Sequence, residues 1–142
     1  MIKIEKFVIS NNDFASGAFN IRRKVFVEEQ QVGTEDEFDE FENVSEHYLA
    51  FYNEIPVGTA RWRHTLKGIK LERFAVLEEY RSKKIGSYVL KEVLRDVIPL
   101  KKKIYLHAQL PAVNFYKREG FTEEGNVFYE CDIAHYLMSY NP

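Results

Sequence analysis

The sequence predicts an α/β domain with a mixed sheet flanked by helices, and three observations favour this fold class. The 142 residues, of which 45% are hydrophobic, provide enough material for one compact core and too little for two. Short segments rich in branched and aromatic residues alternate with segments whose apolar residues recur every three or four positions. The helical segments stand between strands, as crossover helices do in sheets that contain parallel pairs. We therefore expect a single domain over residues 1–142.

The N-terminal segment predicts a strand followed by a helix. Ile2–Val8 is typical of a short strand, and the polar residues Asn11–Asp13 are candidate helix caps. In Phe14–Val27 the apolar residues recur at helical intervals, with Arg22–Lys24 on the other faces. Glu28–Glu46 shows no sustained period, so we expect a loop or a short irregular helix there. Connectors of this length inside a compact domain are often functional.

The middle of the chain predicts a hairpin and a central strand. His47–Tyr52 and Ile55–Arg63 are rich in aromatic and branched residues and flank Asn53 and Glu54, as the strands of a hairpin flank their turn. Gly68–Val76 finishes in Phe-Ala-Val, which suits a strand that crosses the centre of the sheet.

The C-terminal half predicts two more helices between strands. Ile85–Val97 has one apolar face and reads as a helix, and Lys103–Ala108 as a strand. Pro111–Arg118 is a short helix that Gly120 ends, and the chain from Phe121 onward is strand material.

The single cysteine and the apolar pattern exclude several classes of protein. Cys131 has no partner for an intramolecular disulfide, and we expect it to be a small buried hydrophobe. The four histidines show no metal-ligand spacing, so we expect no metal. The first ten residues lack the apolar core of a signal peptide, and no apolar run approaches membrane-spanning length. These features predict a soluble, cytoplasmic protein with no membrane partner.

The net charge of −2 conceals a strong separation of charge along the chain. Residues 25–60 carry ten acidic side chains and no Lys or Arg, whereas residues 61–103 carry thirteen basic and five acidic side chains. Such a chain can present an anion-binding surface and an acidic surface together, unlike the uniformly basic face that duplex nucleic acid demands. We therefore expect no nucleic-acid partner. Solvated surface remains the alternative explanation of both charged segments.

A basic turn at the start of the expected helix 85–97 is the most informative segment. Arg81, Lys83 and Lys84 lie at the positive end of the helix dipole, where cations are disfavoured by a few tenths of a kcal/mol each. Their placement is explained if an anion binds there, to the free N–H groups of the first helical turn, with Gly86 allowing close approach. A basic turn on an idle surface is the alternative.

Two motifs give the chain its resemblance to the GCN5-related N-acetyltransferase (GNAT) superfamily. Arg81-Ser-Lys-Lys-Ile-Gly86 is similar to the family's phosphate-binding signature, with Lys84 in place of its first glycine. Ala112-Val-Asn-Phe-Tyr116-Lys-Arg-Glu-Gly-Phe121 resembles the second signature, and Gln109 stands where the family often has Asn. Residues 21–30 and 135–138 further resemble the ElaA and YjcF group of small bacterial acetyltransferases.

The resemblance implies a GNAT-like acyl-CoA N-acyltransferase fold and acetyl-CoA as co-substrate. Its mixed, mostly antiparallel sheet would have a central V-shaped splay between two parallel strands, 69–76 and 103–108. The backbone of Phe74, Ala75 and Val76 would bind the pantetheine amides, and an N–H there would stabilise the oxyanion. The remaining residues expected to contact CoA are Arg81, Ser82, Lys83, Lys84, Ile85, Gly86, Ser87, Gln109 and Asn114.

Acyl transfer to an amine needs a proton donor for the leaving thiolate and an acceptor for the amine proton. The resemblance implies Tyr116 as general acid, with a core tyrosine as the alternative. Glu72, beside the pantetheine strand, is a candidate base that would act directly or through water. Glu29, His107 and His135 are the other candidates.

The acceptor would lie beside the acidic segment 28–46, which favours a cationic small-molecule or peptidyl amine. Phe26, Glu29, Arg61, His107 and His135 are candidate acceptor contacts, Arg61 for a carboxylate on the acceptor. A homodimer is compatible with these features. The competing hypothesis is a catalytically weak or inactive protein of the same fold that binds CoA or a partner.

Overall fold

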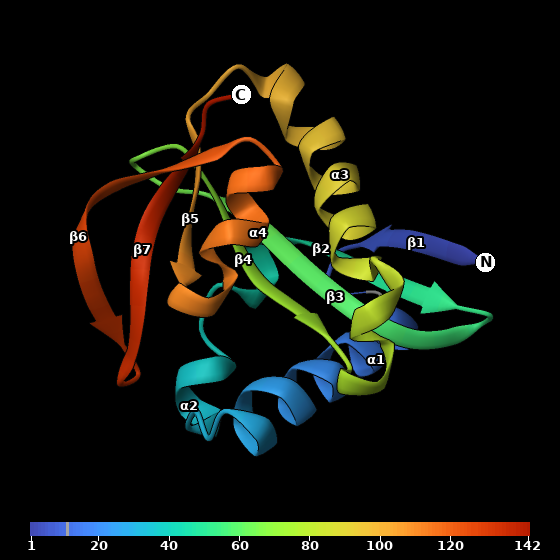
Figure 1. The fold of residues 1–142 in the computed structure, drawn as a ribbon. Helices are drawn as coiled ribbons and strands as arrows, with labels where there is room; N and C mark the ends of the chain where they lie inside the picture. Colours follow the sequence, from blue (N-terminus) through green and yellow to red (C-terminus); the bar gives the residue numbers. More distant parts are fainter. Residues whose placement is uncertain (11) are drawn as a thin grey trace.

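A seven-stranded sheet runs through the computed structural model, which describes residues 1–10 and 12–142 (Figure 1). The strands lie in the order β1-β2-β3-β4-β5-β7-β6, and every neighbouring pair is antiparallel except β4 and β5. Their bounds are β1 (Ile2–Phe7), β2 (Glu46–Tyr52), β3 (Ile55–His64), β4 (Ile69–Val76), β5 (Ile104–Gln109), β6 (Phe121–Glu130) and β7 (Ile133–Tyr140). The predicted mixed α/β class is thereby confirmed.

The helices follow the predicted order, with one difference in the first of them. The α-helices are α1 (Asn12–Arg22), α2 (Thr34–Glu37), α3 (Ile85–Val97) and α4 (Val113–Arg118). The first helix continues past α1 as a π-helix, η1 (Arg23–Glu29), a change that the 3.6-residue period does not reveal. Short 3₁₀ segments are η2 (Glu42–Val44), η3 (Glu78–Lys83), η4 (Ile98–Leu100) and η5 (Leu110–Ala112). Asn11, an expected cap, lies outside the described residues.

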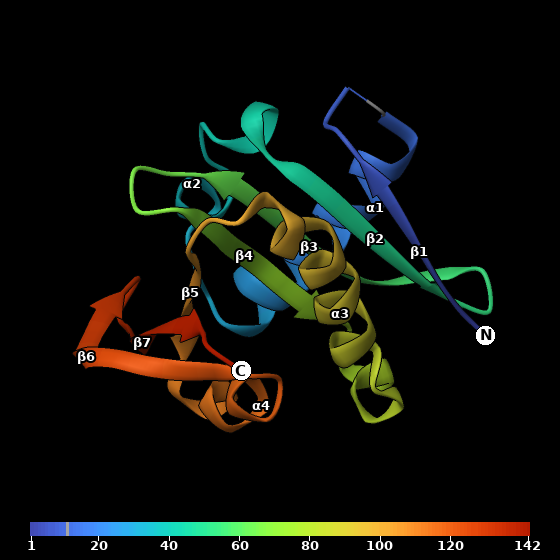
Figure 2. The same ribbon diagram turned by 90° about the horizontal axis from the view of Figure 1, so that it is seen from above.

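Helices cover both faces of the sheet (Figure 2). Successive β2 residues point to opposite faces, and accordingly Leu49 packs with α1 while Ala50 packs with α3. The cluster with α1 contains Ala18, Ile21 and Val25, the periodic positions of the first helix. Arg22, expected on another face, is 1% exposed and therefore buried as well. In the described part of the chain, no helix combines the length and the apolarity needed to span a membrane.

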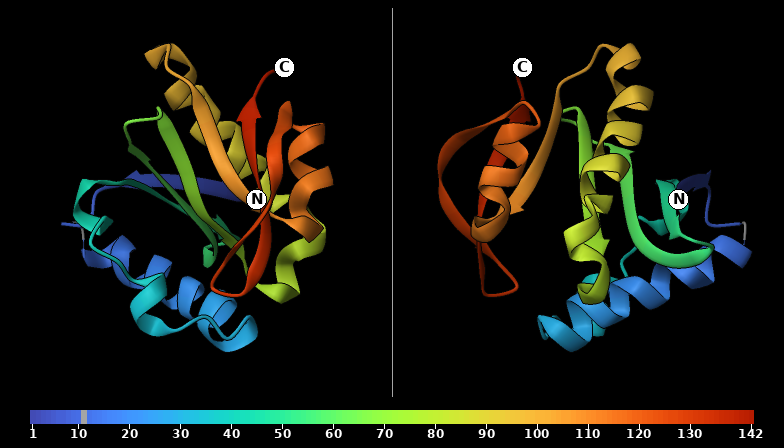
Figure 3. Two further views of the ribbon diagram at one scale, coloured as in Figure 1. Left: turned by 90° about the vertical axis from the view of Figure 1, so that its left-hand side faces the viewer. Right: turned by 45° about the vertical axis from the view of Figure 1, so that its right-hand side comes forward.

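The parallel pair at the centre of the sheet separates along its length. β4 and β5 are paired only from Ile69 with Ile104 to Leu71 with Leu106. Beyond these pairs β4 stays on β3 and β5 stays on β7, so the two halves of the sheet diverge (Figure 3). The V-shaped splay predicted for these strands is present.

Candidate active site

A cleft of about 300 Å³ opens where β4 and β5 separate. Its walls come from the two strands, η1 and the residues after it, α4, and the turn between β6 and β7. The predicted site residues that line it are Phe26, Glu72, Phe74, Arg81, His107, Gln109, Tyr116 and His135. The fold thus brings together residues that lie far apart in the sequence, in a cavity of the size that small-molecule sites have.

The backbone of the open half of β4 is available on one side. Ala75 pairs with Thr59 and Val76 with Gly58, both on β3. On the other side of this part of β4 no strand is paired, because β5 has already diverged from it. Of the three predicted pantetheine contacts, only Phe74 lines the cleft. The backbone N–H and C=O groups along this edge can therefore form hydrogen bonds with a ligand that takes the place of a neighbouring strand.

Arg81 reaches from the basic turn to both sides of the cleft mouth. Its Nε donates to the Val76 carbonyl at 2.9 Å, and its two terminal nitrogens donate to the Glu29 carboxylate at 2.8 Å each. The hydrogen bond from Arg81 lowers the pKa of Glu29. Glu29 is therefore an ionised partner of Arg81 in this structure, and it does not line the cleft.

The basic turn keeps the backbone conformation that its motif suggests. Lys84, directly before α3, has φ of 62° and ψ of 22°, the left-handed region that favours glycine. A Cβ on Gly86 would meet only Phe115 Cζ at 3.7 Å and Val76 Cγ2 at 3.9 Å, so packing does not require glycine there. The start of α3 therefore has room for a ligand beside its unpaired N–H groups.

The other residues of this turn differ in what they can offer a ligand. Ser82 and Lys83 are exposed, and Lys83 lies over the Tyr52 ring at 5.0 Å. The Ile85 side chain is buried in the core, which leaves its backbone amide as the available group. Ser87 donates to Glu119 at 3.2 Å.

Tyr116 presents its hydroxyl to the cleft from an aromatic setting of Phe74, Phe115 and Phe121. Its side chain is buried, which raises the pKa of the phenol. No described residue forms a hydrogen bond with this hydroxyl. Because every fully buried polar side-chain atom of the described residues has a hydrogen-bond partner, this oxygen is not fully enclosed and is open to the cleft. Tyr116 is thus a protonated donor throughout the neutral pH range.

Of two further residues predicted to contact CoA, Gln109 lines the cleft and Asn114 does not. Gln109 Nε2 donates to Gln30 Oε1 at 2.9 Å, which links the end of β5 to the end of η1. Asn114 is exposed on α4 and does not line the cleft. The structure therefore does not support a contact from the Asn114 side chain to a ligand in the cleft.

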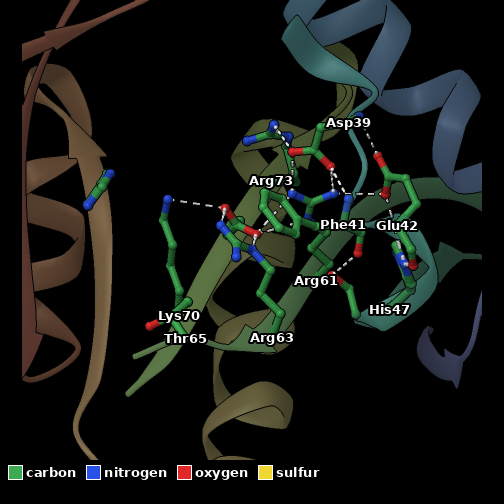
Figure 4. A network of polar contacts seen from close by, with 12 residues as sticks. Asp39, Phe41, Glu42, His47, Arg61, Arg63, Thr65, Lys70 and Arg73 are labelled. Carbon is green, nitrogen blue, oxygen red and sulfur yellow. Dashed lines mark hydrogen bonds and ion pairs between the residues drawn. The ribbon is translucent and has the colours of Figure 1, made fainter. Parts of the chain in front are cut away.

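Arg61 belongs to a buried network of ion pairs (Figure 4). Glu72, its partner on β4, is part of the same network. Glu72 lies 2.9 Å from Arg61, 2.7 Å from Arg63 and 3.2 Å from Lys70. Burial opposes ionisation, yet these cations lower the pKa of Glu72 to about 2. A carboxylate held in this way is a very weak base, which argues against Glu72 as the proton acceptor. Arg61 is fully buried and outside the cleft wall, so its assignment as an acceptor contact is wrong.

The network predicts that the protein loses stability in acid. The pKa values of Glu72 and Asp39 are both lowered to about 2, Asp39 by Arg61, although burial alone would raise them. A lowered folded-state pKa stabilises the fold above the unfolded pKa, and this stability is lost as pH falls through the folded pKa. One pKa unit corresponds to ~1.4 kcal/mol, so Glu72 alone contributes about 3 kcal/mol, lost between pH 5 and about pH 2.

Denaturant unfolding at pH 7, 5 and 3 measures this loss. Glu37 acts in the opposite sense, because burial raises its pKa, and it moderates the effect. In Glu72→Gln the free energy of unfolding should depend less on pH between 5 and 3 than in the wild type. Equal slopes in the two proteins would contradict the assignment.

Four of the nine carboxylates in the acidic segment 28–46 pair with the protein's own arginines. Glu37 binds Arg22 at 2.8 Å and Arg73 at 3.1 Å, and Glu42 binds Arg22 at 2.7 Å. The expected acidic surface is thereby reduced to the exposed carboxylates of Glu28, Glu35, Asp36 and Glu40. Asp36 is the acidic residue of the segment that lines the cleft, beside Phe26 from η1.

A carboxylate that the sequence analysis missed lies between the two cleft histidines. Glu130, at the end of β6, is 3.0 Å from His107 Nδ1 and 3.8 Å from His135 Nε2. His135 Nδ1 donates to the Ile133 carbonyl at 2.7 Å. Nothing in the local sequence pairs Glu130 with His107, since the β6–β7 turn and the β5–β7 pairing bring them together.

Cys131 is exposed in the turn that follows Glu130, so the prediction of a buried position is wrong. Cys131 and Asp132 both have positive φ, of 50° and 62°, and a tight turn of this kind leaves its side chains outside the core. Burial and nearby carboxylates raise the pKa of the thiol. Within the described residues, no group of three potential ligands is arranged to hold a metal ion.

Known proteins are similar to this chain in sequence and in fold. The uncharacterized N-acetyltransferase YjcF of Bacillus subtilis is 39% identical over 133 residues, which cover 92% of this chain and 95% of that protein. Escherichia coli ElaA has a crystal structure that matches with a TM-score of 0.89, at 26% identity, over 99% of this chain and 100% of that one. A Thermoplasma acidophilum PaiA N-acetyltransferase in complex with coenzyme A shares the fold at 17% identity, with a TM-score of 0.71 over 100% and 99% of the two chains.

The family comparison covers most of the chain. A family model described as an acetyltransferase (GNAT) domain matches residues 14–142, which include both signature motifs, the cleft and the β6–β7 turn. This chain belongs to the GNAT family of acetyltransferases.

Proposed function

We propose that this chain transfers the acetyl group of acetyl-CoA to a primary amine by direct attack in a ternary complex. The observation that carries the proposal is the separation of β4 and β5 beyond Leu71 and Leu106, which opens a slot between a basic turn and Tyr116. Direct attack is favoured over a covalent intermediate because the thiol of Cys131, which lines the cleft, has a raised pKa and is protonated at neutral pH.

The residues around the slot fit coenzyme A. The open backbone edge of Phe74–Val76 suits the pantetheine amides, and the start of α3 suits the pyrophosphate. Arg81 uses three of its five N–H groups on Val76 and Glu29, which leaves two for a phosphate oxygen. When bound, acetyl-CoA supplies the thioester that the amine attacks.

Tyr116 is the proposed general acid. Its hydroxyl opens into the cleft and its raised pKa keeps it protonated, so it can give a proton to the departing thiolate. An N–H of the open edge at Phe74 or Val76 is proposed to stabilise the negative charge that develops on the thioester oxygen. Glu72, held by three cations, is not proposed as the base.

The proposed acceptor is a cationic amine, free or on a peptide. Four of the nine carboxylates of the acidic segment have arginine partners, and Glu72 in the cleft wall is held by three cations. The proposal therefore depends on the other two acidic residues of the cleft wall, Asp36 and Glu130. Asp36 comes from α2, and Glu130 stands at the end of β6, directly before the β6–β7 turn.

Replacing Lys84 by glycine should stabilise the fold and weaken CoA binding. Removing a side chain from the left-handed region should add about 0.5 to 1 kcal/mol to the free energy of unfolding. Loss of one exposed charge beside a phosphate should raise the Kd for CoA about two- to fivefold. Thermal unfolding and calorimetric titration measure the two effects.

Lys101→Gly is the matched control for this variant. Lys101 has φ of 57° at the end of η4, so the same gain in stability is expected, with no change in CoA binding. If Lys84→Gly bound CoA as tightly as Lys101→Gly does, the Lys84 side chain would have no role at the phosphates.

Calorimetric titration with acetyl-CoA and CoA, followed by thiol release with a panel of amines, tests the proposed function. Binding together with amine-dependent thiol release is the expected result. No binding at millimolar CoA would overturn the proposal, and binding without turnover for any amine would favour the non-catalytic CoA-binding alternative.

A further inference from the structure

His107 stands at the point where the cleft begins. Its neighbour Leu106 is the last β5 residue paired with β4, and His107 itself pairs through its backbone with Leu137 of β7. The side chain lines the cleft and is 21% exposed. The Phe128 ring packs edge-on against it, with 4.9 Å between ring centroids, which limits rotation of the imidazole.

Glu130 determines which nitrogen of His107 is free. Glu130 Oε2 lies 3.0 Å from His107 Nδ1, and the hydrogen bond from His107 lowers the pKa of Glu130. An ionised carboxylate only accepts hydrogen bonds, so in the neutral imidazole Nδ1 carries the proton and Nε2 has the lone pair. Nε2 has no hydrogen-bond partner among the described residues. A histidine with one nitrogen bound to a carboxylate and the other free has the arrangement of a base that the carboxylate orients.

The other titratable groups around His107 are engaged differently. From β4, Lys70 lies 3.2 Å from Glu72, which Arg61 and Arg63 also hold, and the charge of Lys70 contributes to the lowered pKa of Glu130. From β7, His135 donates its Nδ1 proton to a carbonyl and its Nε2 lies 3.8 Å from Glu130, so both of its ring nitrogens face groups of the protein. Tyr105, on the same strand, shares a hydrogen bond with Thr65 at 2.7 Å.

We propose that His107 is the catalytic base that takes the proton of the acceptor amine, that Glu130 is its positioning residue, and that the acceptor is an alkylammonium compound. This proposal rests on the proposed function. It assigns the base to the wall opposite β4, and it gives the one carboxylate of the β6–β7 turn that contacts His107 a function in the reaction.

The proton balance follows from the reaction. The ammonium nitrogen gives one proton to His107 Nε2, which passes it to solvent, and the freed lone pair forms the N–C bond to the thioester carbonyl. The C–S bond breaks with its electrons on sulfur, which takes a proton from Tyr116. The nitrogen then loses a second proton, which restores the Tyr116 hydroxyl. One proton is released for each acetyl group transferred.

The test compares His107→Gln with wild type on two kinds of acceptor. For an alkylamine, which is protonated at neutral pH, kcat/KM should fall about 10²- to 10³-fold, the usual contribution of a general base. For an alkoxyamine, which is neutral at the assay pH, the fall should be less than about tenfold. His64→Gln, an exposed histidine on β3, is the matched control and should behave as wild type.

Glu130→Gln tests the positioning role. In Glu130→Gln, the acidic limb of the pH profile of kcat/KM for the alkylamine should move to lower pH, because the imidazolium loses its carboxylate partner. Glu130→Asp keeps a carboxylate, so its acidic limb should lie close to that of the wild type. A merely structural role would not move this limb. Glu123→Gln, on the same strand and paired with Lys117 at 3.2 Å, is the control.

The outcomes separate this inference from the proposed function. If the wild type releases no thiol with any amine, the proposed function fails. If the wild type is active and His107→Gln loses activity equally on both kinds of acceptor, or not at all, His107 is not the base while the transferase function stands. A selective loss in His135→Gln would assign the base to His135 and overturn the proposal.

Discussion

Replacing Arg61 by methionine will lower the free energy of unfolding by about 3 to 5 kcal/mol, the usual cost of removing one partner from a buried ion pair. Arg61 is fully buried and contacts three carboxylates, those of Asp39, Glu42 and Glu72, at 2.8 to 2.9 Å. Methionine fills most of the volume, so the loss reports the uncompensated carboxylates rather than a cavity. Urea unfolding at pH 7, followed by circular dichroism, measures it.

The control is Arg95→Met, which removes an exposed arginine paired only with Glu92 on the same helix at 3.0 Å. Its effect should stay within about 0.5 kcal/mol. If Arg61→Met does not fold, Arg61→Lys takes its place in the test. Lysine retains the positive charge but lacks the planar guanidinium group, so Arg61→Lys should give an intermediate loss of stability. A loss of less than about 1 kcal/mol in Arg61→Met would mean that the carboxylates are hydrated, contrary to their burial.

The charged segments of the sequence have a structural meaning that their positions alone do not reveal. Four carboxylates of the acidic segment 28–46 pair with Arg22, Arg61, Arg73 and Arg81, which come from the regions on either side of it. These pairs join the connector to β3, β4 and the basic turn. The separation of charge along the sequence thus corresponds to ion pairs between distant parts of the chain. Only the carboxylates outside these pairs remain to interact with a ligand.

Most of the fold could be predicted from the sequence because its elements are locally consistent. The helix Ile85–Val97 has its apolar residues on one face, and its predicted bounds are those of α3. The hairpin was predicted from its turn and its aromatic strands, and β2 and β3 confirm it. The π-helix η1 could not be predicted, because its apolar positions also satisfy the α-helical period.

The site was predictable only where a motif carried it. The basic turn, Tyr116 and Gln109 were found from local patterns, and Arg81, Gln109 and Tyr116 line or approach the cleft. The burial of Arg61 and the contact between His107 and Glu130 depend on which strands lie side by side, which no local pattern states. Charged residues in a strand look alike in sequence whether they face water or a counter-ion.

Replacing Tyr116 by phenylalanine should lower kcat about 10²- to 10³-fold with little change in the KM for acetyl-CoA, since only the proton for the leaving thiolate is lost. The hydroxyl bonds to no described residue, so thermal stability should stay within about 0.5 kcal/mol of wild type. Steady-state thiol release and thermal unfolding measure the two quantities. A kcat equal to that of wild type would assign the proton donor to water or to another residue.

Tyr48→Phe is the matched control, because it should lower the stability of the protein and leave kcat unchanged. The Tyr48 hydroxyl donates to Asp96 at 2.6 Å and accepts from Trp62 at 3.0 Å, away from the cleft. Its removal should cost about 1 to 2 kcal/mol of stability and leave kcat unchanged. Because burial also raises the pKa of Tyr116, its titration cannot produce an alkaline loss of activity near neutral pH. An alkaline limb that persists in Tyr116→Phe would therefore come from another group.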